Sequence, residues 1–267
     1  MKKLFMILTI ISIALAAVSV DAAEQKIVGK NVTYSVGGTT MKGYLAYDSA
    51  ILDKRPGILV VHEWWGLNDY IRHRARMLAE LGYVAFAVDM YGNGKVATHP
   101  QDAQTFSSKL ANNFDTMKLR FLAAEQLLKK QKMVDRKKIA AIGYCFGGGV
   151  VLNMALQGVD LKGVASFHGS LGAVGDVKPG SVKAKIIIFN GDADKFNALE
   201  QIKAIKEKMG KAGVNYKFMS YPGAMHSFTN PDADKYAKEF NLPIAYNAEA
   251  DKKSWEEMKM FLDAIFR

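Results

Sequence analysis

Short strand-like runs recur along this chain, and amphipathic stretches with helical periodicity separate them. The runs are Gly57–Val61, Val84–Val88, Lys138–Gly143, Gly163–Phe167, Ile186–Phe189 and Tyr216–Ser220. The expected helices are Ile71–Leu81, two between Gln101 and Gln131, one after Gly143, Ala198–Lys211 and Lys253–Phe266. Continuous apolar strands alternating with helices predict an α/β fold, with a mostly parallel central sheet and helices on both of its faces.

The segment before this alternation has a different pattern. Val28–Tyr34 and Met41–Tyr47 alternate in polarity and are joined across Gly37-Gly38, which predicts an N-terminal β-hairpin. No internal repeat, low-complexity segment or Pro/Ser-rich linker divides the chain after its first residues. We therefore expect residues 23–267 to form a single domain, long enough to bury a full core without disulfides.

The first residues are typical of a secretory signal peptide. Lys2 and Lys3 precede an uncharged, largely apolar run from Leu4 to Val20, and a small residue, Ala22, follows at a plausible cleavage point. We expect residues 1–22 to be removed and the protein to be exported, to the periplasm or the medium. An uncleaved membrane anchor is the alternative, because the apolar run is close to the length that spans a bilayer.

The charge of the chain gives no sign of a nucleic-acid partner. Its 36 Lys and Arg residues exceed its 26 Asp and Glu residues, for a formal net charge of +10. The lysines are spread along helical stretches and form no basic motif, so we predict no nucleic-acid binding. No stable membrane insertion is expected after cleavage. The sequence leaves the oligomeric state open.

The single cysteine, Cys145, follows the strand Lys138–Gly143 and lies within a glycine-rich turn that a helix is expected to follow. A nucleophile flanked on each side by one residue and then a glycine, between a strand and a helix, is typical of the nucleophile elbow of α/β-hydrolases. Here a thiol takes the usual place of a serine hydroxyl. With no second cysteine it forms no internal disulfide, and a leftover thiol in an exported protein indicates function. A buried, structural cysteine is the alternative interpretation.

Two further chemistry-bearing residues follow strands later in the chain. Asp192 comes after Ile186–Phe189, and His226 comes after Tyr216–Ser220. The carboxyl ends of parallel strands share one edge of a sheet, and the order nucleophile, acid, histidine is that of α/β-hydrolase triads. We therefore predict a Cys145, His226, Asp192 triad, with Asp194 as a rival for the acid. His62-Glu63 lacks a second histidine at zinc-binding spacing, so we expect no metal and no cofactor.

Together these segments resemble the dienelactone hydrolase family, cysteine-dependent enzymes with the α/β-hydrolase fold, over roughly residues 34–267. The resemblance implies that Cys145 is the nucleophile, His226 the base and Asp192 the orienting acid. It also implies that Glu63 contacts the resting thiol and helps to activate it, and that the backbone N–H groups of Trp64 and Phe146 form the oxyanion hole. It is carried by His62-Glu63-Trp64-Trp65-Gly66, Val88-Asp89-Met90-Tyr91-Gly92, Gly143-Tyr144-Cys145-Phe146-Gly147-Gly148, Gly191-Asp192-Ala193-Asp194 and His226-Ser227-Phe228.

Aromatic residues of these motifs predict an apolar substrate pocket formed by Trp65, Tyr91 and Phe228 together with Trp64; the resemblance itself places Tyr91 near the substrate. Family members that act on anionic dienelactone carry two arginines where this chain has Asn93 and Asn230. A bidentate carboxylate clamp is therefore missing, and we do not expect dienelactone itself to be the substrate. The sequence thus predicts a hydrolase of small carboxylic esters, lactones or thioesters. A redox-active thiol protein and a non-catalytic envelope ligand-binding protein on the same fold are the alternatives.

Overall fold

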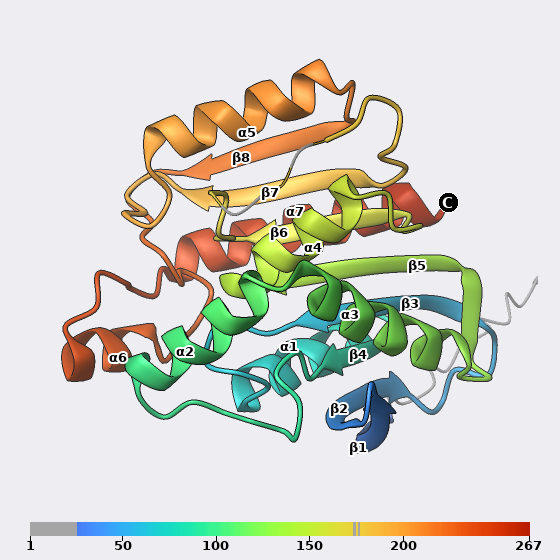
Figure 1. Ribbon diagram of the computed structural model, residues 1–267. Coiled ribbons are helices and arrows are strands. Elements are labelled where there is room, and N and C mark those ends of the chain that lie inside the picture. The colour runs from blue at the N-terminus through green and yellow to red at the C-terminus, as the bar shows by residue number, and fades with distance from the viewer. Residues whose placement is uncertain (1–25, 173–174, 176) are drawn as a thin grey trace, which may run out of the picture.

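The computed structural model describes residues 26–172, 175 and 177–267, so the predicted leader, 1–22, lies outside the described residues. The described strands form one eight-stranded sheet in the order β1-β2-β4-β3-β5-β6-β7-β8 (Figure 1). Its strands are β1 Ile27–Val36, β2 Thr39–Asp48, β3 Arg55–Val61, β4 Val84–Val88, β5 Val134–Tyr144, β6 Gly163–Phe167, β7 Lys185–Gly191 and β8 Tyr216–Tyr221. Its helices are α1 Asp69–Glu80, α2 Pro100–Ala111, α3 Phe114–Lys129, α4 Phe146–Leu156, α5 Leu199–Lys211, α6 Ala233–Phe240 and α7 Ala248–Phe266.

The sheet combines an antiparallel edge with a parallel body. Strands β1 and β2 pair antiparallel from Ile27 opposite Asp48 to Val36 opposite Thr39, which confirms the predicted hairpin. Strand β2 then pairs antiparallel with β4. Every later neighbour, from β4 through β3, β5, β6 and β7 to β8, pairs parallel. The predicted fold class is confirmed.

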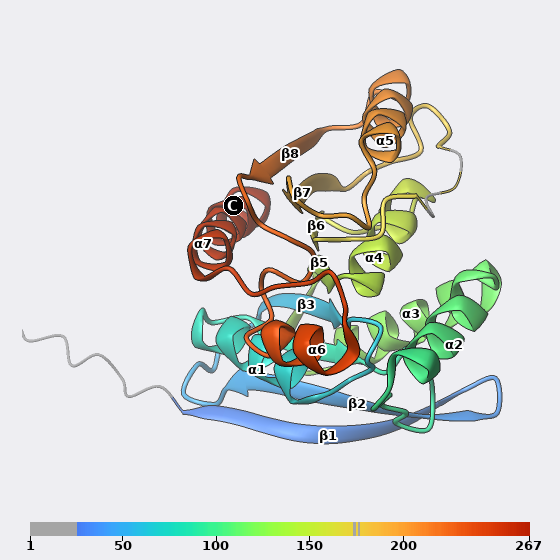
Figure 2. The same ribbon diagram turned by 90° about the vertical axis from the view of Figure 1, so that its left-hand side faces the viewer.

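Two apolar layers cover the two faces of the sheet. Helices α3, α4 and α5 pack with the end of α2 on one face, around residues such as Phe121 and Val150. Helices α1 and α7 cover the other face, around Ile71 and Leu262 (Figure 2). Within β3, Leu59 belongs to the first layer and Ile58 to the second. Successive side chains of a strand point to opposite faces, so strands covered on both sides are apolar throughout rather than alternating.

The sequence pattern did not predict α6. This short helix ends at Asn241, which adopts the left-handed conformation with a φ of 53°. Its residues Tyr236 and Phe240 lie four positions apart and pack their rings 4.6 and 6.0 Å from that of Trp65. The helix thus covers the turn that follows β3. Within the described residues, no helix has both the length and the apolar character needed to cross a membrane.

Candidate active site

Cys145 occupies the turn between β5 and α4, in a conformation that side chains rarely adopt. Its φ of 52° and ψ of −119° bend the chain sharply from the strand into the helix. A Cβ atom added to Gly143 would lie 2.1 Å from the carbonyl oxygen of Gly147, and one added to Gly147 would lie 2.4 Å from that of Val61. Only glycine fits at either position. This geometry is that of a nucleophile elbow, as the glycine spacing predicted.

Backbone hydrogen bonds hold this strained residue in place. The Cys145 N–H donates to the carbonyl oxygen of Phe167 at 3.0 Å and to Nδ1 of His168 at 3.2 Å. The Cys145 carbonyl accepts from the N–H groups of Gly149 and Ser170, at 3.2 and 3.3 Å. The surrounding structure thus fixes the conformation from both sides, as a strained residue requires.

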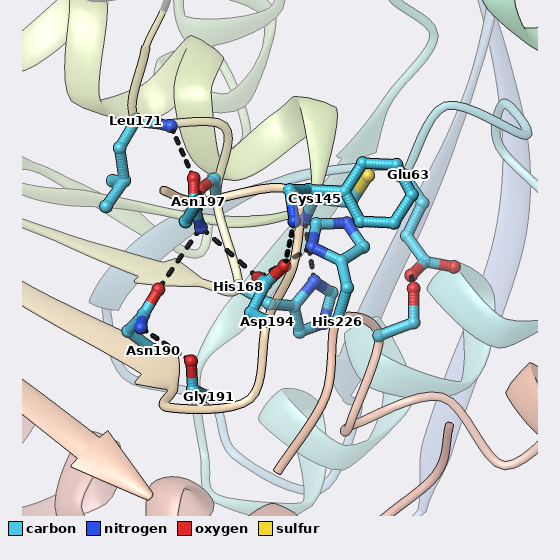
Figure 3. A network of polar contacts seen from close by, with 12 residues as sticks. Glu63, Cys145, His168, Leu171, Asn190, Gly191, Asp194, Asn197 and His226 are labelled. Carbon is cyan, nitrogen blue, oxygen red and sulfur yellow. Dashed lines mark hydrogen bonds and ion pairs between the residues drawn. The ribbon is translucent and has the colours of Figure 1, made fainter. Parts of the chain in front are cut away.

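His226 lies beside Cys145, and its Nδ1 is 2.8 Å from Oδ2 of Asp194 (Figure 3). The prediction that Asp192 holds this histidine is wrong. Asp192 is exposed, and its Oδ1 accepts a hydrogen bond from the N–H of Gly223 at 2.6 Å. Strand β7 ends at Gly191, and in the turn that follows it Asp192 is exposed whereas Asp194 is buried. The rival acid is therefore the one that the fold brings to His226.

Further donors orient the Asp194 carboxylate. Its Oδ1 accepts from the N–H of Phe196 at 2.8 Å, and its Oδ2 accepts from Nδ2 of Asn197 at 3.2 Å. The same amide donates to the Gly169 carbonyl at 2.9 Å, and its Oδ1 accepts from the N–H of Leu171 at 3.2 Å. Asn197 thus ties the acid to the loop after β6, next to the elbow (Figure 3).

The surroundings of His226 favour its charged form. Burial alone would lower its pKa, but the charge and hydrogen bond of Cys145, followed by the contacts with Asp194, raise the pKa to about 10. The ring of His226 is therefore charged at neutral pH.

A second buried histidine, His168, adjoins the elbow, and no sequence motif indicated a role for it. It has a φ of 38°, and its ring centroid lies 5.1 Å from that of His226. Burial, followed by the charge of His226, lowers its pKa well below the ordinary value, so the ring is neutral. Because Nδ1 accepts from Cys145, the proton lies on Nε2, which is 2.7 Å from the Thr229 hydroxyl. His168 is therefore a positioning residue for the Cys145 backbone. Its position at the end of β6 was the sequence feature that could have indicated a place in the site.

Glu63 lies next to this group with partners other than the thiol. Its Oε1 accepts from the Ser227 hydroxyl at 3.1 Å, and its Oε2 accepts from Nδ2 of Asn230 at 2.6 Å. Burial raises its pKa, while those two hydrogen bonds and the charges of His226 and Arg74 oppose the rise. The contact with the resting thiol that the resemblance implied is not among the hydrogen bonds of the described residues. The part that Glu63 plays in activating the thiol stays a prediction.

Cys145 and His226 open onto a cavity of about 510 Å³. Trp64 and Phe146 line it as well, and neither backbone N–H has a hydrogen-bond partner within the described part of the chain. Phe146 is the first residue of α4, where a backbone N–H has no acceptor inside the helix. Two such donors beside a nucleophile are what an oxyanion hole requires, and this role of Trp64 and Phe146 stays a prediction.

Of the four aromatic residues predicted for the pocket, Trp64 lines it, and the other three lie behind its wall. Trp65 packs against α6, and Phe228 is fully buried with its ring 5.3 Å from that of His168. The Tyr91 hydroxyl donates to the Trp64 carbonyl at 2.9 Å, so Tyr91 supports the wall from below. Motif positions could not reveal the real lining, which comes largely from α2, α3 and α4. Besides Cys145, Phe146 and Trp64 it comprises Gln104, Ser107, Ser108, Ala111, Phe114, Met117, Gly149, Val150, Asn153, Gln157, Ser170, Gly175, Phe196, His226, Ser227 and Ile244.

Neither asparagine at a family arginine position presents a charge to the cavity. Asn230 is buried against Glu63, and Asn93 has a φ of 59° in a turn where its N–H donates to the Thr40 carbonyl at 2.6 Å. Among the described residues that line the cavity, only Cys145 and His226 carry ionisable side chains. Nor do His, Cys, Asp and Glu side chains of the described residues gather in threes in a way that could hold a metal ion.

Comparison with known proteins gives a consistent result. The sequence model of the dienelactone hydrolase family matches residues 41–266. Protein usf of Aquifex pyrophilus is 28% identical over 228 residues, which cover 82% of this chain and 97% of that protein. A putative carboxymethylenebutenolidase of Aquifex aeolicus is 26% identical over 206 residues, which cover 76% of this chain and 87% of that protein.

A solved structure agrees with both. The crystal structure of a dienelactone hydrolase-like promiscuous phosphotriesterase from metagenomic libraries is 30% identical, with a TM-score of 0.82. The alignment covers 90% of this chain and 99% of that one. Since the family model spans nearly the whole described chain and the fold agrees, this protein belongs to the dienelactone hydrolase family and is a carboxylic ester hydrolase.

Proposed function

We propose that this protein is a thiol hydrolase of carboxylic esters, lactones or thioesters in which Cys145, His226 and Asp194 act as the triad. One observation carries the proposal. The chain's only cysteine stands on a strained elbow, beside a histidine held by a carboxylate and two free backbone N–H groups, on the wall of a cavity. A structural cysteine needs none of these neighbours.

The geometry supports a two-step reaction. The Cys145 sulfur attacks the carbonyl carbon, and the carbonyl oxygen takes up negative charge facing the N–H groups of Trp64 and Phe146. The intermediate collapses to a thioester on Cys145, and the imidazolium of His226 gives its proton to the departing alkoxide. His226 then takes a proton from water, whose oxygen attacks the thioester. The acid leaves and the thiolate returns. Throughout, Asp194 accepts from Nδ1 and so keeps Nε2 directed at the reacting atoms.

Turnover of a panel of aryl esters and lactones tests this proposal directly. Wild type is expected to release the alcohol over many turnovers, and Cys145→Ala to release none above background. Ser181→Ala is the matched control, because Ser181 is half-buried and is not among the residues that line the cavity. Full turnover by folded Cys145→Ala would overturn the assignment.

We also propose that the protein is exported, on the strength of its N-terminal sequence alone: two lysines, an apolar run and Ala22. Cell fractionation with intact-mass measurement tests this proposal. The expected result is a periplasmic or secreted chain that begins at Ala23. A chain that keeps its first residues and stays in the cytosol would contradict it.

A further inference from the structure

The cavity beside Cys145 extends along a helix rather than ending at the nucleophile. Residues Phe146, Gly149, Val150, Asn153 and Gln157 line it from α4 and its C-cap. Their spacings of three or four place them on one face of the helix. Eleven residues at about 1.5 Å each make this wall about 16 Å long, measured from the elbow.

The opposite wall has the same character. Residues Gln104, Ser107, Ser108 and Ala111 line the cavity from α2, again at spacings of three and four, and Phe114 and Met117 of α3 continue it. Figure 2 shows these helices on the same side of the sheet. The cavity is therefore a groove between two helices, here called the α2–α4 groove. It begins at the buried Cys145 and reaches solvent at the exposed Gln157.

The polarity of the groove changes along its length. Near the elbow, Phe146, Val150 and Met117 make it apolar. Toward the open end, Asn153 and Gln157 make it polar, and Gln104 adds a further amide from α2. Among the described residues that line the groove, only Cys145 and His226, at the elbow, are ionisable. Lys208 lies near this rim, where it donates to the Gly175 carbonyl at 3.1 Å, but it is not among the residues that line the groove. A carboxylate bound along α4 beyond the elbow would lose hydration, and no lysine or arginine of the described lining would provide a counter-charge, which is costly.

The position of His226 decides which part of an ester lies in the groove. His226 protonates the leaving oxygen, so the alcohol lies on its side, near Phe196 and Ile244. The acyl group then extends the other way, past Phe146 and Val150. We propose that the α2–α4 groove is an acyl-binding site and that the substrates are esters with an extended, uncharged acyl chain. This inference rests on the proposed function and adds the substrate class to it.

Acyl-chain length tests the inference with the leaving group held constant. For p-nitrophenyl esters from acetate to octanoate, below their micelle concentrations, kcat/KM is expected to rise about fourfold for each buried methylene. Ala111 is exposed on α2 and faces the groove, so Ala111→Trp fills the groove with little risk to the fold. This variant is expected to lower the ratio of the octanoate rate to the acetate rate, and so to lose most of the gain with chain length. Thr105→Trp, on the same helix and outside the lining, is the matched control.

A charged acyl group tests the inference that the acyl chain of the substrate is uncharged. A half-ester that ends in a carboxylate is expected to react about 100-fold more slowly than the neutral ester of equal length. Gln104 is exposed at the groove, and Gln104→Arg supplies a counter-charge. It is expected to raise the rate on the half-ester about tenfold relative to the rate on octanoate. Equal rates on both esters in wild type would overturn the claim of an uncharged substrate.

Failure of this inference is distinguishable from failure of the proposed function. If acetate is turned over by Cys145 but chain length and Ala111→Trp have no effect, the groove is not an acyl site and the hydrolase stands. If no ester is turned over, alkylation of Cys145 by N-alkyl iodoacetamides of increasing length still tests the groove by intact mass. Faster labelling by longer chains, lost in Ala111→Trp, supports the groove. A rate independent of length contradicts it.

Discussion

Cys145 is held in its strained conformation by partners on neighbouring strands, and the same partners orient the groups that act with it. Its N–H donates to Nδ1 of His168, whose ring packs against His226, and His226 is in turn held by Asp194. The proposed nucleophile, base and acid are thus parts of one buried network. Changing one member should impair the others more than changing any neighbour outside the network.

The two aspartates after β7 provide a matched pair of substitutions that tests which of them is the acid. Asp194→Asn removes the charge that holds His226 and permits the wrong tautomer, so kcat/KM is expected to fall about 10³-fold or more. Asp192→Asn changes an exposed turn residue and is expected to stay within about twofold of wild type. Ester hydrolysis by both purified variants is the measurement. The opposite ranking would restore Asp192 as the acid.

The charge of His226 predicts a distinctive titration. Its folded-state pKa of about 10 lies above the ordinary 6.5. The stability that it contributes is therefore complete below pH 6.5 and is lost as the pH rises through about 10. NMR titration is expected to find the ring charged from neutral pH to nearly pH 10 in wild type. In Cys145→Ala the pKa should fall, because the leading raising contact is gone and burial opposes the charge. An unchanged value in Cys145→Ala would contradict the thiolate–imidazolium pair.

At the scale of elements, the elbow depends on the close approach of α4 to the end of β3. Gly147 passes so near this strand that an added Cβ would lie 2.4 Å from the Val61 carbonyl oxygen and 2.6 Å from that of His62. This approach places the Phe146 and Trp64 N–H groups on the same cavity wall. The packing of two elements thus sets the distance between the two proposed oxyanion donors.

A pair of glycine variants tests this contact. Gly147→Ala forces α4 away from β3 and is expected to cost about 3 kcal/mol of stability. It should also sharply reduce kcat. Gly210→Ala, in α5, meets no atom within 4 Å and is expected to add about 0.5–1 kcal/mol without changing activity. Urea denaturation and ester hydrolysis measure both effects. A neutral Gly147→Ala would show that the elbow does not need this approach.

The features that could be predicted from the sequence have local causes, whereas those that could not depend on contacts between distant parts of the chain. Strands such as Val84–Val88 and the glycine-bounded turn at Cys145 were predictable, because apolar runs and steric demands are local. The choice between Asp192 and Asp194 could not be predicted, because it depends on which of the two the turn after β7 buries against His226. The groove was not predictable either, since α2 and α4 meet only through tertiary packing. One feature could have predicted helix α6 and was missed: Tyr236 and Phe240 are aromatic residues at positions i and i+4.

At the scale of the whole molecule, a buried arginine connects the N-terminal half to the C-terminal helix. Arg74 of α1 donates to Asp251 of α7 at 2.6 Å and to the carbonyl of Thr229 at 2.5 Å. The Thr229 hydroxyl contacts Nε2 of His168, which places this network one residue from the elbow. The layer that α1 and α7 build therefore also supports the proposed site from beneath.

Breaking this ion pair should therefore affect both stability and activity. Asp251→Asn leaves the nearly inaccessible Arg74 without its counter-charge, and a loss of about 3 kcal/mol is expected. Glu249→Gln, which breaks an exposed pair with Lys253 on the same helix, is expected to change stability little. Urea denaturation of both variants is the measurement. Equal stability of the two would show that the Arg74 charge is compensated elsewhere.

Trapping the covalent intermediate shows whether Cys145 is the nucleophile. Wild type is mixed with an aryl ester of a bulky, slowly released acyl group, quenched in acid during turnover, and analysed by intact and peptide mass. The account predicts one acyl group on the peptide that contains Cys145, labile to hydroxylamine, and none in Cys145→Ala. Steady turnover with no adduct on that peptide, retained in Cys145→Ala, would contradict it.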